Sequence, residues 1–260
     1  MMLTSENYFS QEAQMEYFGS SQIKQFMKCE AQAMAELRGE YVPEKSTALL
    51  VGSYVDAHFE GTLDLFQAHH PELFRRDGTL KSEFIQAEDI IARCEQDPLF
   101  MEYMGGEKQK ILTAELFGYK FKIKIDSYLE DRAIVDQKVM KDFEKKYVEG
   151  MGKVNFIEAW GYDIQGAIYQ KVEQIAAGRK NPLPFILACA TKQRDGADLG
   201  LFQIPQYKLD AALKVVEANI DYIAAVKQGL AEPIRCEKCT YCRQTKVLSG
   251  VKVLEDIDNE

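Results

Sequence analysis

The chain has 260 residues, of which 46% are hydrophobic and 28% are charged, a composition that allows one domain with a substantial buried core. It contains no run of about 18 apolar residues, which argues against a membrane-spanning helix, and its polar, acidic first residues lack the layout of a signal peptide, so we expect a cytoplasmic protein. The formal net charge of −9 argues against a protein that coats nucleic acid through overall positive charge.

The first third of the sequence predicts helices. Apolar residues recur three and four positions apart from Ser20 to Leu37, with Ser20 or Ser21 as a candidate N-cap, which indicates one helix. Two further helices are expected over residues 47–60 and 81–95.

The pattern then changes to the alternation that is typical of strands. Three strands are expected at 108–117, 118–129 and 132–140, joined by short turns into a meander. Beyond them, the sequence predicts a long amphipathic helix, two strands and a last helix, at residues 156–178, 184–192, 199–205 and 210–229.

Three charged residues, Asp126, Asp136 and Lys138, interrupt two of the predicted strands. If these strands pair across the turn between them, the two aspartates converge at one end of the sheet, with Lys138 beside Asp136. Two close carboxylates repel each other unless a cation lies between them, and oxygen ligands suit Mg²⁺ or Mn²⁺. Lys138 would then orient or deprotonate a water, or stabilise charge on a phosphate. A surface salt bridge is the alternative, and the short Asp-x-Lys pattern alone favours it.

Two helices offer further candidates. In the helix at 47–60, Asp56 lies on the apolar, inward face, whereas His58 lies about 200° round the helix on the outer face. Asp56 is therefore a candidate third ligand. In the long helix, Gln165 and Tyr169 are four residues apart, so they are adjacent on one face and could hold a phosphate or nucleotide near the metal.

These residues resemble the motifs of the PD-(D/E)XK nuclease superfamily, in the branch of RecB-type nuclease domains and RecE-like (exodeoxyribonuclease VIII-type) phage or prophage exonucleases. The matching segments are KIKID, IVDQK, QGAIY and VGSYVDAHFEG, which end at Asp126, Lys138, Tyr169 and Gly61. They follow the family's order within residues 20–245. The resemblance implies an α/β fold, a restriction-endonuclease-like core with a central mixed β-sheet flanked by helices.

The resemblance also implies roles for these residues. Asp126 and Asp136 would bind Mg²⁺ or Mn²⁺, with Gln137 between the motif residues also assigned to the metal site. Lys138 would be the catalytic lysine. Gln165 and Tyr169 would belong to the DNA-side helix, and Asp56 stands where the family usually has histidine.

The implied function is a metal-dependent DNA exonuclease of phage or prophage recombination, located in the host cytoplasm if a phage encodes it. It would act on DNA, most naturally linear duplex ends, and could work with a single-strand annealing protein or as a homo-oligomer. The alternative function is a non-catalytic DNA-binding or assembly module that retains the nuclease fold.

Six cysteines divide into two groups. Cys94 and Cys189 lie in apolar segments and are expected in the core. The others, spaced C-x2-C-x2-C near the C-terminus with one far upstream, suggest a metal site made of Cys29, Cys236, Cys239 and Cys242.

The identity of that metal is open. The related iron–sulfur nucleases suggest a [4Fe–4S] cluster, zinc is the rival because four thiolates suit a tetrahedral ion, and unligated thiols are a third possibility. We treat residues 1–260 as a single nuclease-like domain. Within it, the cysteine-rich segment 232–246 is expected to pack on the N-terminal helix, and 247–260 is expected to be a flexible tail.

Overall fold

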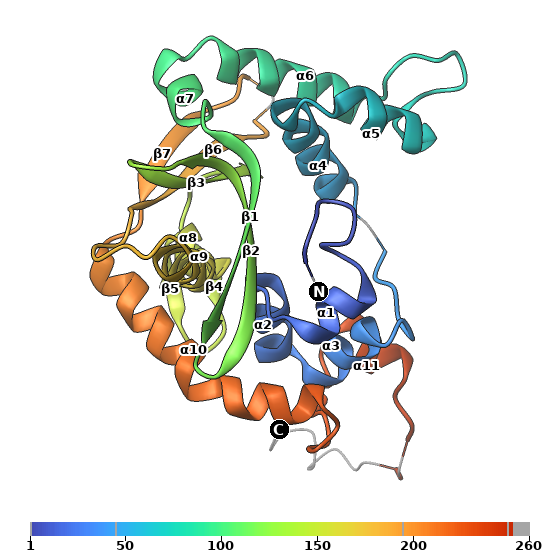
Figure 1. The fold of residues 1–260 in the computed structure, drawn as a ribbon. Helices are drawn as coiled ribbons and strands as arrows, with labels where there is room; N and C mark the ends of the chain where they lie inside the picture. Colours follow the sequence, from blue (N-terminus) through green and yellow to red (C-terminus); the bar gives the residue numbers. More distant parts are fainter. Residues whose placement is uncertain (1, 45, 194, 249, 252–260) are drawn as a thin grey trace.

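The computed structural model describes residues 2–44, 46–193, 195–248 and 250–251. A mixed five-stranded sheet with the order β1-β2-β3-β6-β7 lies at its centre (Figure 1). The pairs β1–β2, β2–β3 and β6–β7 are antiparallel, whereas β3–β6 is parallel. The strands span Glu107–Leu116, Tyr119–Leu129, Ala133–Met140, Phe185–Thr191 and Leu199–Gln203.

Helices cover both faces of the sheet because its inner strands are apolar on both sides. On β3, Ile134 belongs to one hydrophobic core and its neighbour Val135 to the other. Four larger helices pack on the first core: α2 (Ser20–Lys28), α3 (Glu30–Leu37), α9 (Tyr162–Ala176) and α10 (Gln206–Lys227). Four helices cover the second core: α4 (Thr47–Glu60), α5 (Leu63–His69), α6 (Ser82–Glu95) and α7 (Pro98–Tyr103).

Short elements complete the fold. They are α1 (Gln11–Glu16), the 3-10 helix η1 (Pro71–Leu73), the hairpin strands β4 (Lys146–Val148) and β5 (Gly152–Val154), and the helices α8 (Phe156–Ala159) and α11 (Thr240–Gln244). The N-terminal segment pairs with the edge of β2, where Phe18 N–H donates to Lys120 O at 2.8 Å and Lys122 N–H donates to Phe18 O at 2.9 Å.

Two predicted helices were wrong in extent. The helix expected from Ser20 to Leu37 is broken at Cys29, whose backbone is extended (φ −164°), and Gly19 rather than a serine precedes its first turn. The long helix expected at 156–178 is divided into α8 and α9 by Gly161, whose φ of 63° is left-handed and suits glycine. The break at Cys29 is imposed by tertiary structure, because Lys28, Glu30 and Ala31 around it favour helix, whereas the break at Gly161 falls on a residue that disfavours helix.

The predicted strands and the helices at 47–60 and 81–95 are present with small changes in their ends. Cys94 and Cys189 are fully buried, as expected. Most of the expected flexible tail, residues 249 and 252–260, lies outside the described residues. Within the described part of the chain, no helix has both the length and the apolar character needed to cross a membrane.

Candidate active site

The site forms where strands β2 and β3 separate. Their pairing ends at Ser127 opposite Val135, whereas β3 continues alongside β6 to Met140. Asp126 and Asp136 occupy the next positions of that register, at the fork. The backbone N–H of Gln137, where β3 is no longer paired with β2, donates instead to Asp126 Oδ2 at 2.8 Å. The fork therefore fixes one carboxylate and opens space beside the other.

Asp136 is held by two neighbours. Its side chain is only 2% exposed, and its Oδ2 forms an ion pair with Lys138 Nζ. Its Oδ1 accepts a hydrogen bond of 2.7 Å from Gln165 Nε2 on α9. One turn further along that helix, Tyr169 Oη donates to Lys124 O at 3.0 Å. The Gln/Tyr pair thus connects α9 to both separating strands.

Negative charge is concentrated in this region. Burial raises the pKa of Asp126 to about 6, and nearby Asp136 adds to the rise. Burial, with the proximity of Asp126, also raises the pKa of Asp56 well above its ordinary range. Burial alone would lower the pKa of Lys138, but Asp136 and Asp126 outweigh burial and raise it. Asp56, Asp126 and Asp136 all act electrostatically on Lys138, and a divalent cation would reduce the repulsion among these carboxylates.

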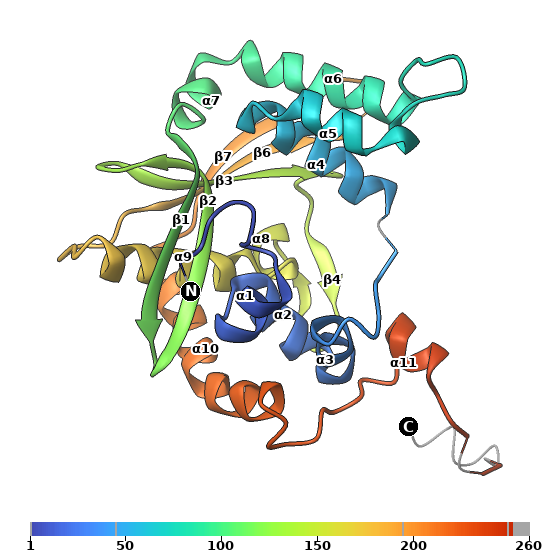
Figure 2. The same cartoon turned by 45° about the vertical axis from the view of Figure 1, so that its right-hand side comes forward.

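The carboxylates open into a cavity of about 760 Å³. Its walls come from the sheet, from α2 and α3, from α4 and α5, from α9, and from the N-terminal segment. Both views show that segment beside β2, in the space between α4 and α2 (Figures 1 and 2). Asp56, Asp126, Asp136 and Lys138 all line this cavity, as do Gln165 and Tyr169.

Two residues considered in the sequence analysis, Gln137 and His58, lie outside the cavity. Gln137 is 3% exposed and lines a small adjoining space with Asp56 and Asp126, so its side chain lies beside the cavity rather than in it. His58 lies on the outer side of α4, where Nε2 is 2.8 Å from Glu95 Oε1. Its position agrees with the helical periodicity.

Glu60 and Gln109 are among the cavity residues that sequence reasoning missed. Glu60 lies one turn after Asp56 on α4 and lines the cavity too, which the four-residue spacing could have indicated. Gln109 on β1 donates from Nε2 to Asp126 Oδ1 at 3.3 Å. Its φ of 53° is left-handed, an unfavourable conformation for a residue other than glycine. No sequence signal marks Gln109, which lies on β1 between Lys108 and Lys110, the residues that pair with Ser127 and Ile125 of β2.

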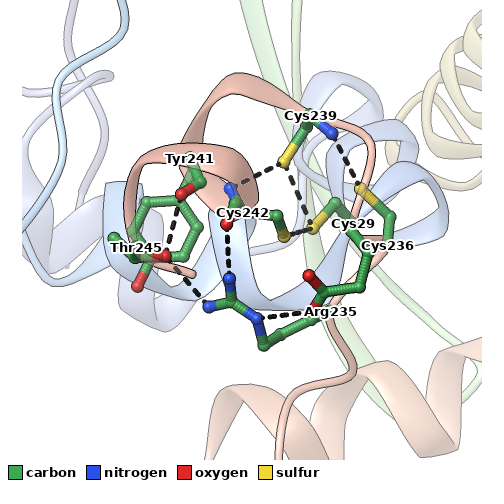
Figure 3. Close-up of polar contacts among 8 residues, drawn as sticks. Cys29, Arg235, Cys236, Cys239, Tyr241, Cys242 and Thr245 are labelled. Atoms are coloured by element: carbon green, nitrogen blue, oxygen red, sulfur yellow. Dashed lines mark hydrogen bonds and ion pairs between the residues drawn. The ribbon is translucent and has the colours of Figure 1, made fainter. Parts of the chain in front are cut away.

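Four cysteines form a second cluster about the start of α3 (Figure 3). The Sγ atoms of Cys29, Cys236, Cys239 and Cys242 all lie within 4.8 Å of one another. Cys29 Sγ is 3.5 Å from Cys242 Sγ and 3.7 Å from Cys239 Sγ, and none of the four cysteines is in a disulfide. Among the described residues, this is the one group of three or more Cys, His or carboxylate ligands gathered so closely. The three aspartates are more widely spaced around the cavity.

Arg235 forms hydrogen bonds within the cysteine-rich segment 232–246. Its Nη2 donates to Cys242 O at 2.6 Å, and its Nη1 donates to Thr245 Oγ1 at 3.0 Å (Figure 3). The segment also binds α3 directly, since Ala31 N–H donates to Ile234 O at 3.1 Å. The break at Cys29 therefore places its thiol against residues more than 200 positions away.

Comparison with known proteins identifies the family. The model of a PDDEXK-like domain of unknown function matches residues 19–245. The chain belongs to this family. Membership confirms the resemblance to the PD-(D/E)XK nuclease superfamily, and the mixed central sheet flanked by helices confirms the restriction-endonuclease-like fold.

One solved structure is similar over nearly the whole chain. It is the crystal structure of a protein from Eubacterium rectale described as a candidate exonuclease, with 49% identity, a TM-score of 0.94, and coverage of 99% of this chain and 98% of that chain. The structure of SSO0001 covers 74% of this chain and 83% of its own at 13% identity, but its TM-score of 0.29 carries no argument. No curated protein matches the chain. The family and the similar structure together support a nuclease.

Proposed function

We propose that this PDDEXK-like protein is a divalent-metal-dependent exonuclease that hydrolyses phosphodiester bonds in DNA. The observation that carries the proposal is the fork between β2 and β3, which brings Asp126 and Asp136 to one cavity. Lys138 and Gln165 both contact Asp136 there. The name given to the Eubacterium rectale protein supports the exonuclease activity.

The donor set fits a hard cation, because carboxylate oxygens in excess over positive charge suit Mg²⁺ or Mn²⁺. Asp126 and Asp136 would hold the ion, with Asp56 as a further ligand. When bound, the ion would supply a Lewis acid that polarises the phosphate and lowers the pKa of water. Gln165 fixes the orientation of Asp136, and Lys138 brings a positive charge to the place where a phosphate oxygen or attacking water would lie.

The test compares three proteins on two DNA substrates with Mg²⁺ or Mn²⁺. Wild type should degrade linear duplex DNA and leave covalently closed circles intact. Asp136→Ala should degrade neither. Asp221→Ala is the matched control, because Asp221 is an exposed aspartate on α10 that accepts a hydrogen bond from Tyr119. Identical results for wild type and Asp136→Ala would instead indicate the non-catalytic DNA-binding module.

The role in phage or prophage recombination, with an annealing partner, rests on the resemblance of the motifs to RecE-like exonucleases. Assembly into a homo-oligomer likewise remains a proposal.

We assign the four cysteines to a structural metal site. The distances between their sulfur atoms favour a single metal ion over an iron–sulfur cluster. Four thiolates at about 2.3 Å from one tetrahedral zinc lie about 3.8 Å from one another. The separations of 3.5 and 3.7 Å from Cys29 Sγ are close to this value. In a [4Fe–4S] cluster each thiolate binds a different iron, so the sulfur atoms are spread more widely.

Metal analysis of protein purified without oxygen distinguishes the two. One zinc per chain in a colourless protein supports the single ion. About four irons with acid-labile sulfide and a brown colour would establish the cluster, and absence of bound metal would establish free thiols.

A further inference from the structure

We propose that the catalytic cavity receives a single DNA strand, with one base stacked on Phe9 and the adjacent phosphate held by Lys124. The inference rests on the proposed nuclease function and assigns its substrate form. Three observations carry it: the size of the cavity, the order of charges along β2, and the aromatic residues at the cavity wall.

The cavity is too small for a double helix. Its volume of about 760 Å³ falls within the range of about 300–1,000 Å³ that encloses one ligand of ordinary size. A cube of 760 Å³ is about 9 Å on a side, whereas the major groove of B-DNA, which is only part of the width of the duplex, is already about 12 Å wide, so a duplex would not enter. A few nucleotides of one strand match the space that leads to Asp126 and Asp136.

Charges on β2 form a track toward the catalytic carboxylates. Lys122, Lys124 and Asp126 alternate along the strand, so they share one face, and all three line the cavity. At about 3.3 Å per residue, Lys124 stands about 7 Å from Asp126 along the strand. This is about twice the 3.4 Å rise per phosphate in a duplex strand, a step that an extended single strand can reach. Lys124 is therefore placed for the phosphate next to the one that is cut.

Aromatic rings surround the same lysine. Lys124 Nζ lies 5.1 Å from the ring centroid of Phe9 and 5.9 Å from that of Tyr8. The Phe9 side chain lines the cavity, yet Phe9 is 66% exposed. An exposed aromatic ring beside a positive charge is the arrangement that binds single-stranded nucleic acid, by stacking on a base while the charge contacts the backbone.

The ring of Phe9 packs against a buried aromatic residue, Tyr8. Buried Tyr8 contacts it edge to face, with centroids 4.9 Å apart and planes at 84°. Tyr8 is in turn fixed by buried Lys122, whose Nζ donates to Tyr8 O. One side of the Phe9 ring thus packs on the protein while the rest stays open to a ligand.

The test measures binding of a short single-stranded oligonucleotide by fluorescence anisotropy at several salt concentrations, without added divalent metal. Phe9→Ala should raise the Kd about ten-fold, the loss expected for one stacked base, and should leave the salt dependence unchanged. Phe9→Trp should restore binding. Lys124→Gln should reduce the slope of log K against log salt by about 0.7, the value for one phosphate of a single strand.

Matched controls come from the β4–β5 hairpin, where Tyr147 and Lys153 are exposed and do not line the cavity. Tyr147→Ala and Lys153→Gln should bind as wild type does, and thermal melting would confirm that all variants fold. The inference is overturned if Phe9→Ala binds the strand as tightly as wild type, or if a hairpin-capped duplex binds as tightly as the single strand. Wild type that binds the strand but does not hydrolyse it with Mg²⁺ or Mn²⁺ would contradict the proposed nuclease function alone.

Discussion

Gln165 on α9 donates a 2.7 Å hydrogen bond to Asp136 on β3, so a helix outside the sheet sets the orientation of the carboxylate that we propose as a metal ligand. Both side chains are more than 90% buried. In such surroundings the amide restricts the carboxylate to one rotamer and leaves Oδ2 for Lys138.

Replacing Gln165 with alanine should therefore lower DNA hydrolysis about 10- to 100-fold, the effect typical of losing a group that orients a metal ligand. The measurement is the initial rate on linear duplex with saturating Mg²⁺. Gln174→Ala is the control, because Gln174 is on the same helix and donates instead to Lys180 O. Equal rates for the two variants would contradict an orienting role.

Gln109 offers a change that separates stability from activity. Its left-handed backbone (φ 53°) costs on the order of 1 kcal/mol, and glycine would remove that cost while also removing the contact with Asp126. We expect Gln109→Gly to change the free energy of unfolding by less than about 1 kcal/mol, because the greater freedom of glycine in the unfolded chain offsets the relieved strain, and to lower nuclease activity. Urea denaturation and the rate assay check the two effects. A decrease in both quantities would show that the side chain matters mainly for folding.

Loss of a cysteine ligand should loosen the connection between α3 and the C-terminal segment. For Cys29→Ser we expect loss of the bound metal and a decrease of at least about 2 kcal/mol in the free energy of unfolding, because metal binding and folding are coupled. Cys94→Ser is the control for metal content, since Cys94 lies in the other core. Full metal occupancy in Cys29→Ser would remove Cys29 from the ligand set.

Buried Lys227 predicts a dependence of stability on pH. Its Nζ donates to Tyr17 O at 2.9 Å and to Gln22 Oε1 at 3.0 Å. Burial, with the nearby charge of Lys122, lowers its pKa to about 7. The unfolded chain, with a lysine pKa of about 10.4, then binds more protons than the folded chain between pH 7 and 10. Its free energy of unfolding should accordingly rise with pH across that window.

Lys227→Met should lack this rise. The check is urea denaturation of both proteins at pH 7, 8.5 and 10. Between pH 7 and 10, the free energy of unfolding of the wild type should increase by up to about 4 kcal/mol more than that of the variant. Parallel curves would mean that the hydrogen bonds to Lys227 keep its amine charged in the folded state.

Much of the fold follows from local sequence patterns. The strands around Asp126 and Asp136 are predictable because Ile123 and Ile125 alternate with lysines on β2, β3 begins with the apolar pair Ile134 and Val135, and the turn between the strands is short. The same logic brings the two aspartates together.

Other features depend on contacts between distant segments. The extended backbone at Cys29 serves a thiol cluster completed from the C-terminal segment, and the residues on either side still favour helix. The left-handed backbone of Gln109 lies within a strand, where no local pattern indicates it. The β4–β5 hairpin has strands of only three residues, too short to show alternation.

The contact between Cys29 and Cys242 spans 213 positions, and it has a consequence for how the protein is made. Synthesis proceeds from the N-terminus, so the α3 wall of the cavity acquires its last support only after residue 242 has left the ribosome. A nascent chain that already carries all three aspartates therefore lacks this contact until the segment with Cys242 has been made.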